Sequence, residues 1–212
     1  MHWLPCAVAA AAACALPTAA GARTHAGATF LVTTLGASAA GNTAVDETLS
    51  IERGTSGSRL RLASNDGSVL SVPAVFTAQG EIASDSQDGA VTCYNMAVDA
   101  AAHSRRPDVA APPTVFVRFG TSVVQVPLVI AGVQTRGATR TIELNGTSAG
   151  FYSGAGAPVD AGIIIAATVE EQDGALHAAV FDERHYLGTP ANVVGRSTCV
   201  LRRAATPRIT PA

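Results

Sequence analysis

From residue 28 onward the chain is a succession of short β-type runs separated by turn residues, and this pattern limits the fold more than any other feature. The runs are rich in β-branched and apolar residues, and some alternate strictly, as RLRL does at 59–62. Such alternation is typical of a strand with one buried face. Strands are expected at 29–35, 48–53, 59–62, 68–77, 114–119, 123–130, 139–144, 162–169, 175–181 and 198–201. We therefore predict an all-β fold, an antiparallel β-sandwich or a partly open barrel.

Glycine-containing pairs predict where these strands turn. Asn65-Asp66-Gly67, Asn145-Gly146 and Asp173-Gly174 each fit a tight hairpin turn, because glycine tolerates the positive φ that such turns require. The glycine-rich stretch at 146–161 is expected to be a loop. The run GIIIAATV at 162–169 has no polar alternation, so we expect it to be buried on both faces.

Two segments of similar sequence suggest a repeated hairpin unit. The segments at 68–76 and 122–130 each place a proline after a valine-rich run, at Pro73 and Pro127. A proline cannot donate a ladder hydrogen bond, so each position is expected at a sheet edge or a bulge. The sequence therefore suggests a fold built from two similar hairpin units, and chance similarity between valine-rich strands is the alternative.

The chain is organised as one main domain at 23–203 followed by a flexible tail at 204–212. Within the domain, the stretch at 97–113 breaks the β pattern and contains several prolines. We expect it to begin as a short helix that ends before Pro107 and to connect halves at 28–96 and 114–203.

Residues 1–22 are interpreted as a signal peptide. An apolar, alanine-rich run at 4–16 precedes small residues that allow cleavage after Ala20 or Ala22. The run is too short to span a membrane, and no later run is long enough. We expect export to the periplasm or the cell exterior of a bacterium, and lipid anchoring through Cys14 is a minor alternative.

The mature chain keeps two cysteines, Cys93 and Cys199, in a compartment expected to be oxidising. We predict that they form a disulfide, and each lies in a short run typical of a strand, at 91–94 and 197–200. A structural zinc site would need four ligands in paired spacing, which two lone cysteines do not supply.

Composition excludes several classes of function. The formal net charge is −2 and aromatic residues make up 5% of the chain, so neither electrostatics nor stacking favours a nucleic-acid partner. All 14 basic residues are arginine, which rules out catalysis by a lysine side chain.

One string, Gly146-Thr147-Ser148-Ala149-Gly150, matches the G-x-S-x-G pattern of a serine hydrolase. In that motif the serine lies on a sharp turn between a strand and a helix. The residues that follow contain Gly154, Gly156 and Pro158, which do not start a helix. Ser148 is therefore a weak candidate nucleophile, and a small-residue surface loop is the simpler interpretation.

Titratable residues cluster once, near the expected strand at 175–181. His177 is expected to face solvent, His185 to lie just past the strand end, and Asp182 to fall between them. With Ser148 and either Asp160 or Asp182, one of the histidines would complete a catalytic triad. The alternative is a charged, solvated strand end.

No cofactor or metal site is predicted. Asp85-Ser86-Gln87-Asp88-Gly89 matches part of a calcium loop but lacks the bidentate carboxylate at its end. The glycine-rich stretch has no lysine with which to bind phosphate. We therefore expect a non-catalytic binding, adhesion or surface-assembly protein with an unknown protein or small-molecule partner. A secreted serine hydrolase, or an exported inhibitor or small-ligand carrier, is the alternative.

Overall fold

The computed structural model describes residues 27–55, 57–76, 81–83, 88–108, 110–119, 122–154 and 157–205. The predicted signal peptide, Cys14 and most of the predicted tail lie outside these ranges. Within them, the fold is mostly antiparallel β, as predicted, with one helix. The largest sheet has ten strands in the order β5-β4-β3-β2-β1-β12-β11-β10-β9-β8, and it is open rather than closed into a barrel.

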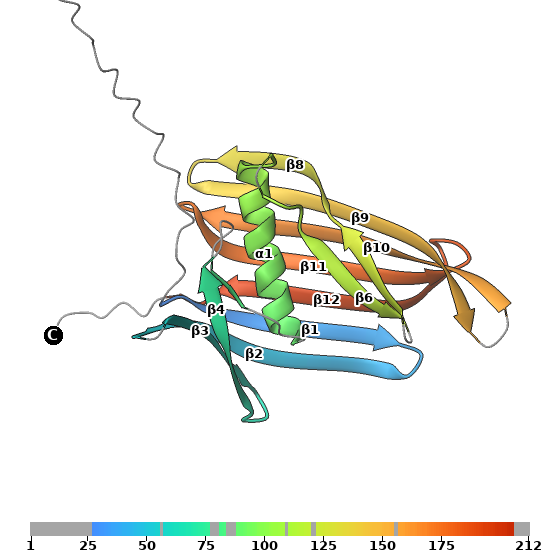
Figure 1. Cartoon of the computed structure of the whole chain (residues 1–212), viewed down its shortest axis with the longest axis horizontal. Helices are drawn as coiled ribbons and strands as arrows, with labels where there is room; N and C mark the ends of the chain where they lie inside the picture. Colours follow the sequence, from blue (N-terminus) through green and yellow to red (C-terminus); the bar gives the residue numbers. More distant parts are fainter. Residues whose placement is uncertain are drawn as a thin grey trace, which may run out of the picture.

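Two meanders make up this sheet, and they meet at its centre (Figure 1). The first comprises β1 (Thr29–Ser38), β2 (Gly41–Gly54), β3 (Gly57–Ser64), β4 (Val69–Phe76) and β5 (Glu81–Ala83). The second comprises β8 (Val129–Arg136), β9 (Thr139–Gly154), β10 (Ala157–Gln172), β11 (Ala175–Leu187) and β12 (Val193–Arg203). β1 pairs with β12, from Phe30 opposite Arg203 to Ser38 opposite Gly195, so the first and last strands join the meanders.

A second layer packs on one face of the sheet. It consists of helix α1 (Gly89–Arg105) and a two-stranded sheet of β6 (Thr114–Phe119) and β7 (Ser122–Pro127). Figure 1 shows α1 crossing the strands of the main sheet, with β6 beside it on the same side. The arrangement is consistent with a sandwich or open barrel in which the smaller layer is largely helical.

Helix α1 is longer and begins earlier than the sequence predicted. Asp88 caps its N-terminus, because the Asp88 carboxylate accepts hydrogen bonds from the backbone N–H groups of Ala90 and Val91. The expected strand around Cys93 is therefore wrong, since Cys93 lies in the second turn of this helix. The valine and threonine beside Cys93 favoured a strand, but the N-cap and the packing of small residues on the sheet outweigh that propensity.

The hydrophobic core lies between the sheet and this second layer. Every other residue of the central strands points into it, as Phe30 and Val32 do from β1, and both are at most 1% exposed. The helix contributes mostly alanines and the fully buried Tyr94, whose ring centroid lies 5.6 Å from that of Phe30. Small helix residues allow α1 to pack closely against the large side chains of the strands.

Two of the three predicted hairpin turns are confirmed. Asp173 and Gly174 have φ of 52° and 72°, the positive values that a tight turn between β10 and β11 requires. Gly67 has φ of 85° in the turn between β3 and β4. Asn145-Gly146 is not a turn but lies within β9, where Asn145 is in register with Ala166.

The expected loop at 146–161 is also wrong, because β9 and β10 continue through most of it. Gly146 serves packing there, since a Cβ atom at this position would lie 2.6 Å from Cδ2 of Leu128. The expectation for 162–169 was partly wrong: Ile163, Ile165 and Val169 are buried, but Ala166 is exposed. Only one face of β10 is covered by the second layer.

The two similar hairpins occupy unlike places in the fold. β3 and β4 belong to the main sheet, whereas β6 and β7 form the small one. The expected return strand at 123–130 is divided by Leu128, whose backbone N–H donates to the carbonyl oxygen of Pro113 at 2.8 Å. On the β5 side of β4, only residues 74–76 are paired. Pro73 lies just outside this paired segment.

Candidate functional site

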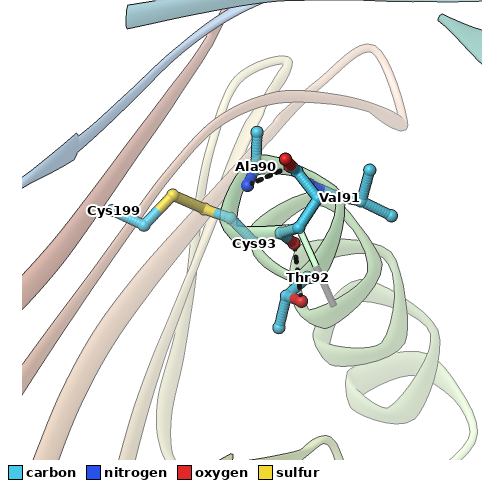
Figure 2. Close-up of a disulfide and its surroundings, with 6 residues drawn as sticks. Ala90, Val91, Thr92, Cys93 and Cys199 are labelled. Carbon is cyan, nitrogen blue, oxygen red and sulfur yellow. Dashed lines mark hydrogen bonds between the residues drawn. A yellow bond between two sulfur atoms is a disulfide. The ribbon is translucent and has the colours of Figure 1, made fainter. Parts of the chain in front are cut away.

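The predicted disulfide joins the helix to the middle of the main sheet (Figure 2). Cys93 of α1 and Cys199 of β12 are bonded, with their Cα atoms 6.3 Å apart, across a separation of 106 residues. Cys93 is fully buried, and Cys199 packs against the hydrophobic core. The bond therefore fixes the N-terminal half of α1 to the central strand pair.

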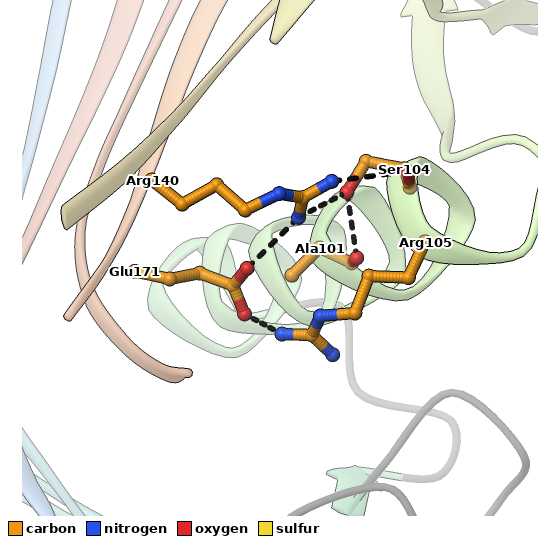
Figure 3. Close-up of polar contacts among 5 residues, drawn as sticks. All are labelled: Ala101, Ser104, Arg105, Arg140 and Glu171. Atoms are coloured by element: carbon orange, nitrogen blue, oxygen red, sulfur yellow. Dashed lines mark hydrogen bonds and ion pairs between the residues drawn. The ribbon is translucent and has the colours of Figure 1, made fainter. Parts of the chain in front are cut away.

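The other end of α1 is held by a cluster of charges that sequence reasoning missed (Figure 3). Glu171 is 1% exposed and forms ion pairs with Arg105 and Arg140, the second at 3.0 Å. Arg140 also donates to Oγ of Ser104 at 2.8 Å and to the Ser104 carbonyl oxygen at 3.0 Å. A cation near the last carbonyl groups of a helix is favourable. This cluster is a structural tie, because its buried carboxylate is shared by two cations.

Asp182 lies on the opposite face of the sheet, within a second polar network. Its carboxylate accepts hydrogen bonds from Arg184 at 2.9 Å and 3.0 Å, from Arg196 at 2.6 Å and from Thr198 at 3.2 Å. Although partial burial acts to raise it, the hydrogen bonds from Arg196 and Arg184 hold the pKa of Asp182 below its ordinary value. Both Arg184 and Arg196 therefore form ion pairs with the Asp182 carboxylate.

Glu183 and His185 form a separate pair on the helix-covered side of the sheet. The two residues are two positions apart in β11, so their side chains share a face, and His185 Nε2 contacts Glu183 Oε1. His185 was expected past the end of a strand, but β11 extends to Leu187. An acid and an imidazole in contact form a unit that can accept and donate hydrogen bonds to a ligand.

This pair lines a groove of about 450 Å³ between the end of the sheet and the β6–β7 hairpin, here called the hairpin groove. Phe116 of β6 also lines the groove, and its side chain is 60% exposed. The remaining lining residues are small or polar: Gly36, Ala37, Ser38, Gly41, Thr43, Gly195, Arg196 and Ser197. An exposed aromatic ring and an acid–imidazole pair therefore border one groove.

Two glycines line this groove close to neighbouring side chains. Gly36 lies so close to the neighbouring strand that a Cβ atom there would be 2.7 Å from Oγ1 of Thr43. Gly195 lies beside His185, where a Cβ atom would be 3.8 Å from that of the histidine. Glycine at position 36 therefore allows β1 to lie beside the Thr43 side chain of β2.

The residues of the hydrolase hypothesis do not come together. Ser148 lies within β9 rather than at a turn before a helix, opposite Ile163 of β10, which is in turn opposite His185 of β11. Ser148 and His185 are therefore two strands apart, about 10 Å between backbones, with the buried Ile163 between them. Such a separation is too long for the hydrogen bond that a serine nucleophile needs.

The other candidates are farther from Ser148. His177 lines a depression of about 420 Å³ with Glu170 and Arg202 on the uncovered face of the sheet, the face that also carries Asp182. His177 is exposed, as expected. The side chain of Asp160 lies outside the described part of the structure.

One further carboxyl group has an unusual environment. Asp99 is partly buried on the side of α1 opposite Ala97 and Ala101, and desolvation raises its pKa from 3.8 to about 6. Neither a hydrogen bond nor an ion pair joins its side chain to another residue that the structure describes. Burial without a compensating partner accounts for the direction of this shift.

The described ranges contain no group of three or more His, Cys, Asp and Glu side chains placed to hold a metal ion. Of the calcium-like segment at 85–89, Asp88 is the N-cap of α1, and residues 85–87 lie outside the described part. Among the residues that the structure describes, no helix has the length and apolar character needed to cross a membrane.

Comparison with known proteins adds no relative from which a function can be transferred. No family model matches the chain, and no curated protein matches it.

Proposed function

We propose that the chain is an exported, non-catalytic binding protein that holds its ligand in the hairpin groove. The observation that carries this proposal is the position of Phe116, which is 60% exposed at a groove that also contains the Glu183–His185 pair. A large exposed aromatic side chain beside a few polar groups is typical of a ligand-binding surface.

The chemistry of the groove favours a polar ligand with one apolar face. The ring of Phe116 offers apolar contact, and the Glu183 carboxylate is a hydrogen-bond acceptor. Hydroxyl groups of Ser38, Thr43 and Ser197 offer both donors and acceptors. A short peptide segment or a sugar has this combination of surfaces. A non-catalytic role is favoured because Ser148 is too far from His185 for a nucleophile–base pair.

Export is inferred from the sequence of residues 1–22, and a disulfide is compatible with an oxidising compartment. Intact-mass analysis of the protein recovered from its own cells tests this part. We expect an N-terminus near Gly21 or Arg23 and a mass two hydrogens below that of the reduced chain. A retained N-terminus would contradict export, whereas a lipid on Cys14 would mean that the exported protein is anchored to a membrane.

Ligand binding is tested by recording the imidazole signals of the oxidised, full domain in NMR spectra while a fragment library is added. His185 lies in the groove and His177 on the opposite face, so each spectrum contains its own control. We expect groove ligands to move the His185 signals and to leave those of His177 unchanged.

Two variants locate the binding site further. Phe116→Ala is expected to weaken a groove ligand about tenfold, since that factor corresponds to about 1.4 kcal/mol and an aromatic contact is of this size. Val69→Ala truncates a 55% exposed side chain far from the groove and is expected to leave affinity unchanged. Equal loss in both variants, or no loss in Phe116→Ala, would show that the ligand binds elsewhere.

A further inference from the structure

The two edges of the main sheet differ in how well they are protected. An exposed edge strand presents unpaired backbone groups to other chains, and proteins commonly blunt such edges by shortness or proline. β5 has three residues, and the adjoining part of β4 contains Pro73. β8 has eight residues without proline and is the last strand of the sheet on the other side, at the top of Figure 1.

Only part of β8 is regular. The register between β8 and β9 shifts between Ile130 and Gly132, and from Gly132 to Arg136 the pairing continues without interruption. Four of these five residues are exposed, including Val133 at 43%. The segment from Gly132 to Arg136 is therefore the part of the edge that can pair with another strand.

The charges beside this segment are complementary to one another. Gly132 is in register with Glu143 of β9, and Oε2 of Glu143 lies 3.5 Å from the position that a Cβ of Gly132 would occupy. Glu143 thus leans over a residue that has no side chain. Arg136 lies on the same face, four residues along β8. Within the described residues, neither Glu143 nor Arg136 forms an ion pair.

We propose that a second copy of this chain pairs with β8, in antiparallel orientation and with Gln134 on the two-fold axis. In this register Arg136 of one copy lies opposite Gly132 of the other. Its side chain can then extend across the glycine to Glu143 in the next strand, about 10 Å away between backbones. A two-fold axis makes the pair twice, so the interface contains two identical Arg136–Glu143 ion pairs.

The rest of the contact fits the same register. Val133 of each copy lies opposite Thr135 of the other, a pair of β-branched residues suited to neighbouring strands. The two Gln134 side chains meet on the face that carries the ion pairs. Backbone hydrogen bonds along five residues supply the remaining contact. Because the paired segment is short, we expect a weak dimer with a dissociation constant on the order of 10 μM.

Sedimentation velocity of the full oxidised domain, over protein concentrations from about 1 to 300 μM, tests this dimer. Arg136→Glu places two carboxylates together and is expected to weaken the dimer at least tenfold, as is Glu143→Arg. The double variant restores opposite charges and should recover an affinity near that of the wild type. Arg202→Glu, which changes an exposed arginine on the uncovered face away from β8, is the control for net charge.

Circular dichroism and thermal unfolding establish that each variant is folded. A monomer at all concentrations would overturn the proposal, and so would a dimer that neither single variant weakens. A double variant no stronger than the single variants would overturn the assigned register and ion pair. Dimerisation that is lost in both single variants, regained in the double variant and kept in Arg202→Glu supports the proposal.

Discussion

Replacing Asp99 by asparagine should make the protein more stable at neutral pH. The pKa of Asp99 is about 6 in the folded chain, against 3.8 for an ordinary aspartate, because burial disfavours its charged form. The folded state therefore binds this proton more tightly than the unfolded state does. The stability that the proton provides is fully present below pH 4 and is lost as the pH rises to about 6.

The size of the effect follows from the shift. A difference of about two pKa units corresponds to a loss of about 3 kcal/mol in the free energy of unfolding above pH 6, as an upper figure. Asparagine is neutral at every pH and avoids this loss. For a domain of this size, 3 kcal/mol corresponds to a change in Tm of roughly 6–12 °C.

Urea unfolding of the wild type and Asp99→Asn at several pH values between 4 and 7.5 measures the difference directly. The two proteins should have similar free energies of unfolding at pH 4, and the variant should gain as the pH rises. Asp66→Ala is a control of opposite sign, because hydrogen bonds from Ser68 lower the pKa of Asp66. Its stabilising effect is lost only on acidification below pH 4, so the difference in free energy of unfolding between wild type and Asp66→Ala should stay constant between pH 4 and 7.5. Parallel curves for wild type and Asp99→Asn would refute the argument from burial.

Two further predictions concern the ties that hold α1 to the sheet. Replacing both Cys93 and Cys199 by alanine should lower the free energy of unfolding by up to about 4.7 kcal/mol, the chain-entropy value for a loop of this length, as measured by urea unfolding. A loss below about 1 kcal/mol would mean that the unfolded chain is already restricted without the bond. Glu171→Ala should cost about 3–5 kcal/mol, because it leaves two arginines without their buried partner. If Glu171→Ala and the wild type have the same urea midpoint of unfolding, the charge cluster does not stabilise the attachment of α1 to the sheet.

Much of the fold could be predicted because strands and turns leave local patterns in the sequence. The alternation at 59–62 and the turn at Asp173-Gly174 depend only on neighbouring residues, and both are correct. The disulfide could be predicted from the two cysteines that lie outside the predicted signal peptide. These features need no knowledge of which strands become neighbours.

The errors arise where distant contacts decide the structure. Asn145-Gly146 has the sequence of a tight turn. In the structure, however, Leu128 packs so closely against Gly146 that a larger residue would not fit. Helix α1 contains β-branched residues near Cys93, and it forms where small side chains fit against the sheet. In each case the residue contacts a segment that is remote in sequence. Local propensity does not include such contacts.

The candidate site could be predicted only in part. Glu183 and His185 lie beyond the strand expected at 175–181, so their spacing of two residues did not indicate a shared face until β11 was seen to extend to Leu187. Phe116 lies at the same groove because the β6–β7 hairpin packs beside that end of the sheet. No local pattern in the sequence predicts where this hairpin packs. Ser148 satisfied a motif, yet its neighbours in the sheet separate it from the histidine.

The pairing of β1 with β12 also has a consequence for the order in which the protein assembles. Phe30 lies opposite Arg203, so the central seam of the sheet joins residues that are 203 − 30 = 173 positions apart in sequence. The two meanders consist of neighbours along the chain and can form early, whereas contacts between distant segments form slowly. A chain emerging from the ribosome lacks β12 until residues Val193–Arg203 appear. We therefore expect closure of the seam to be the late step of folding, with the Cys93–Cys199 bond forming as the two halves meet.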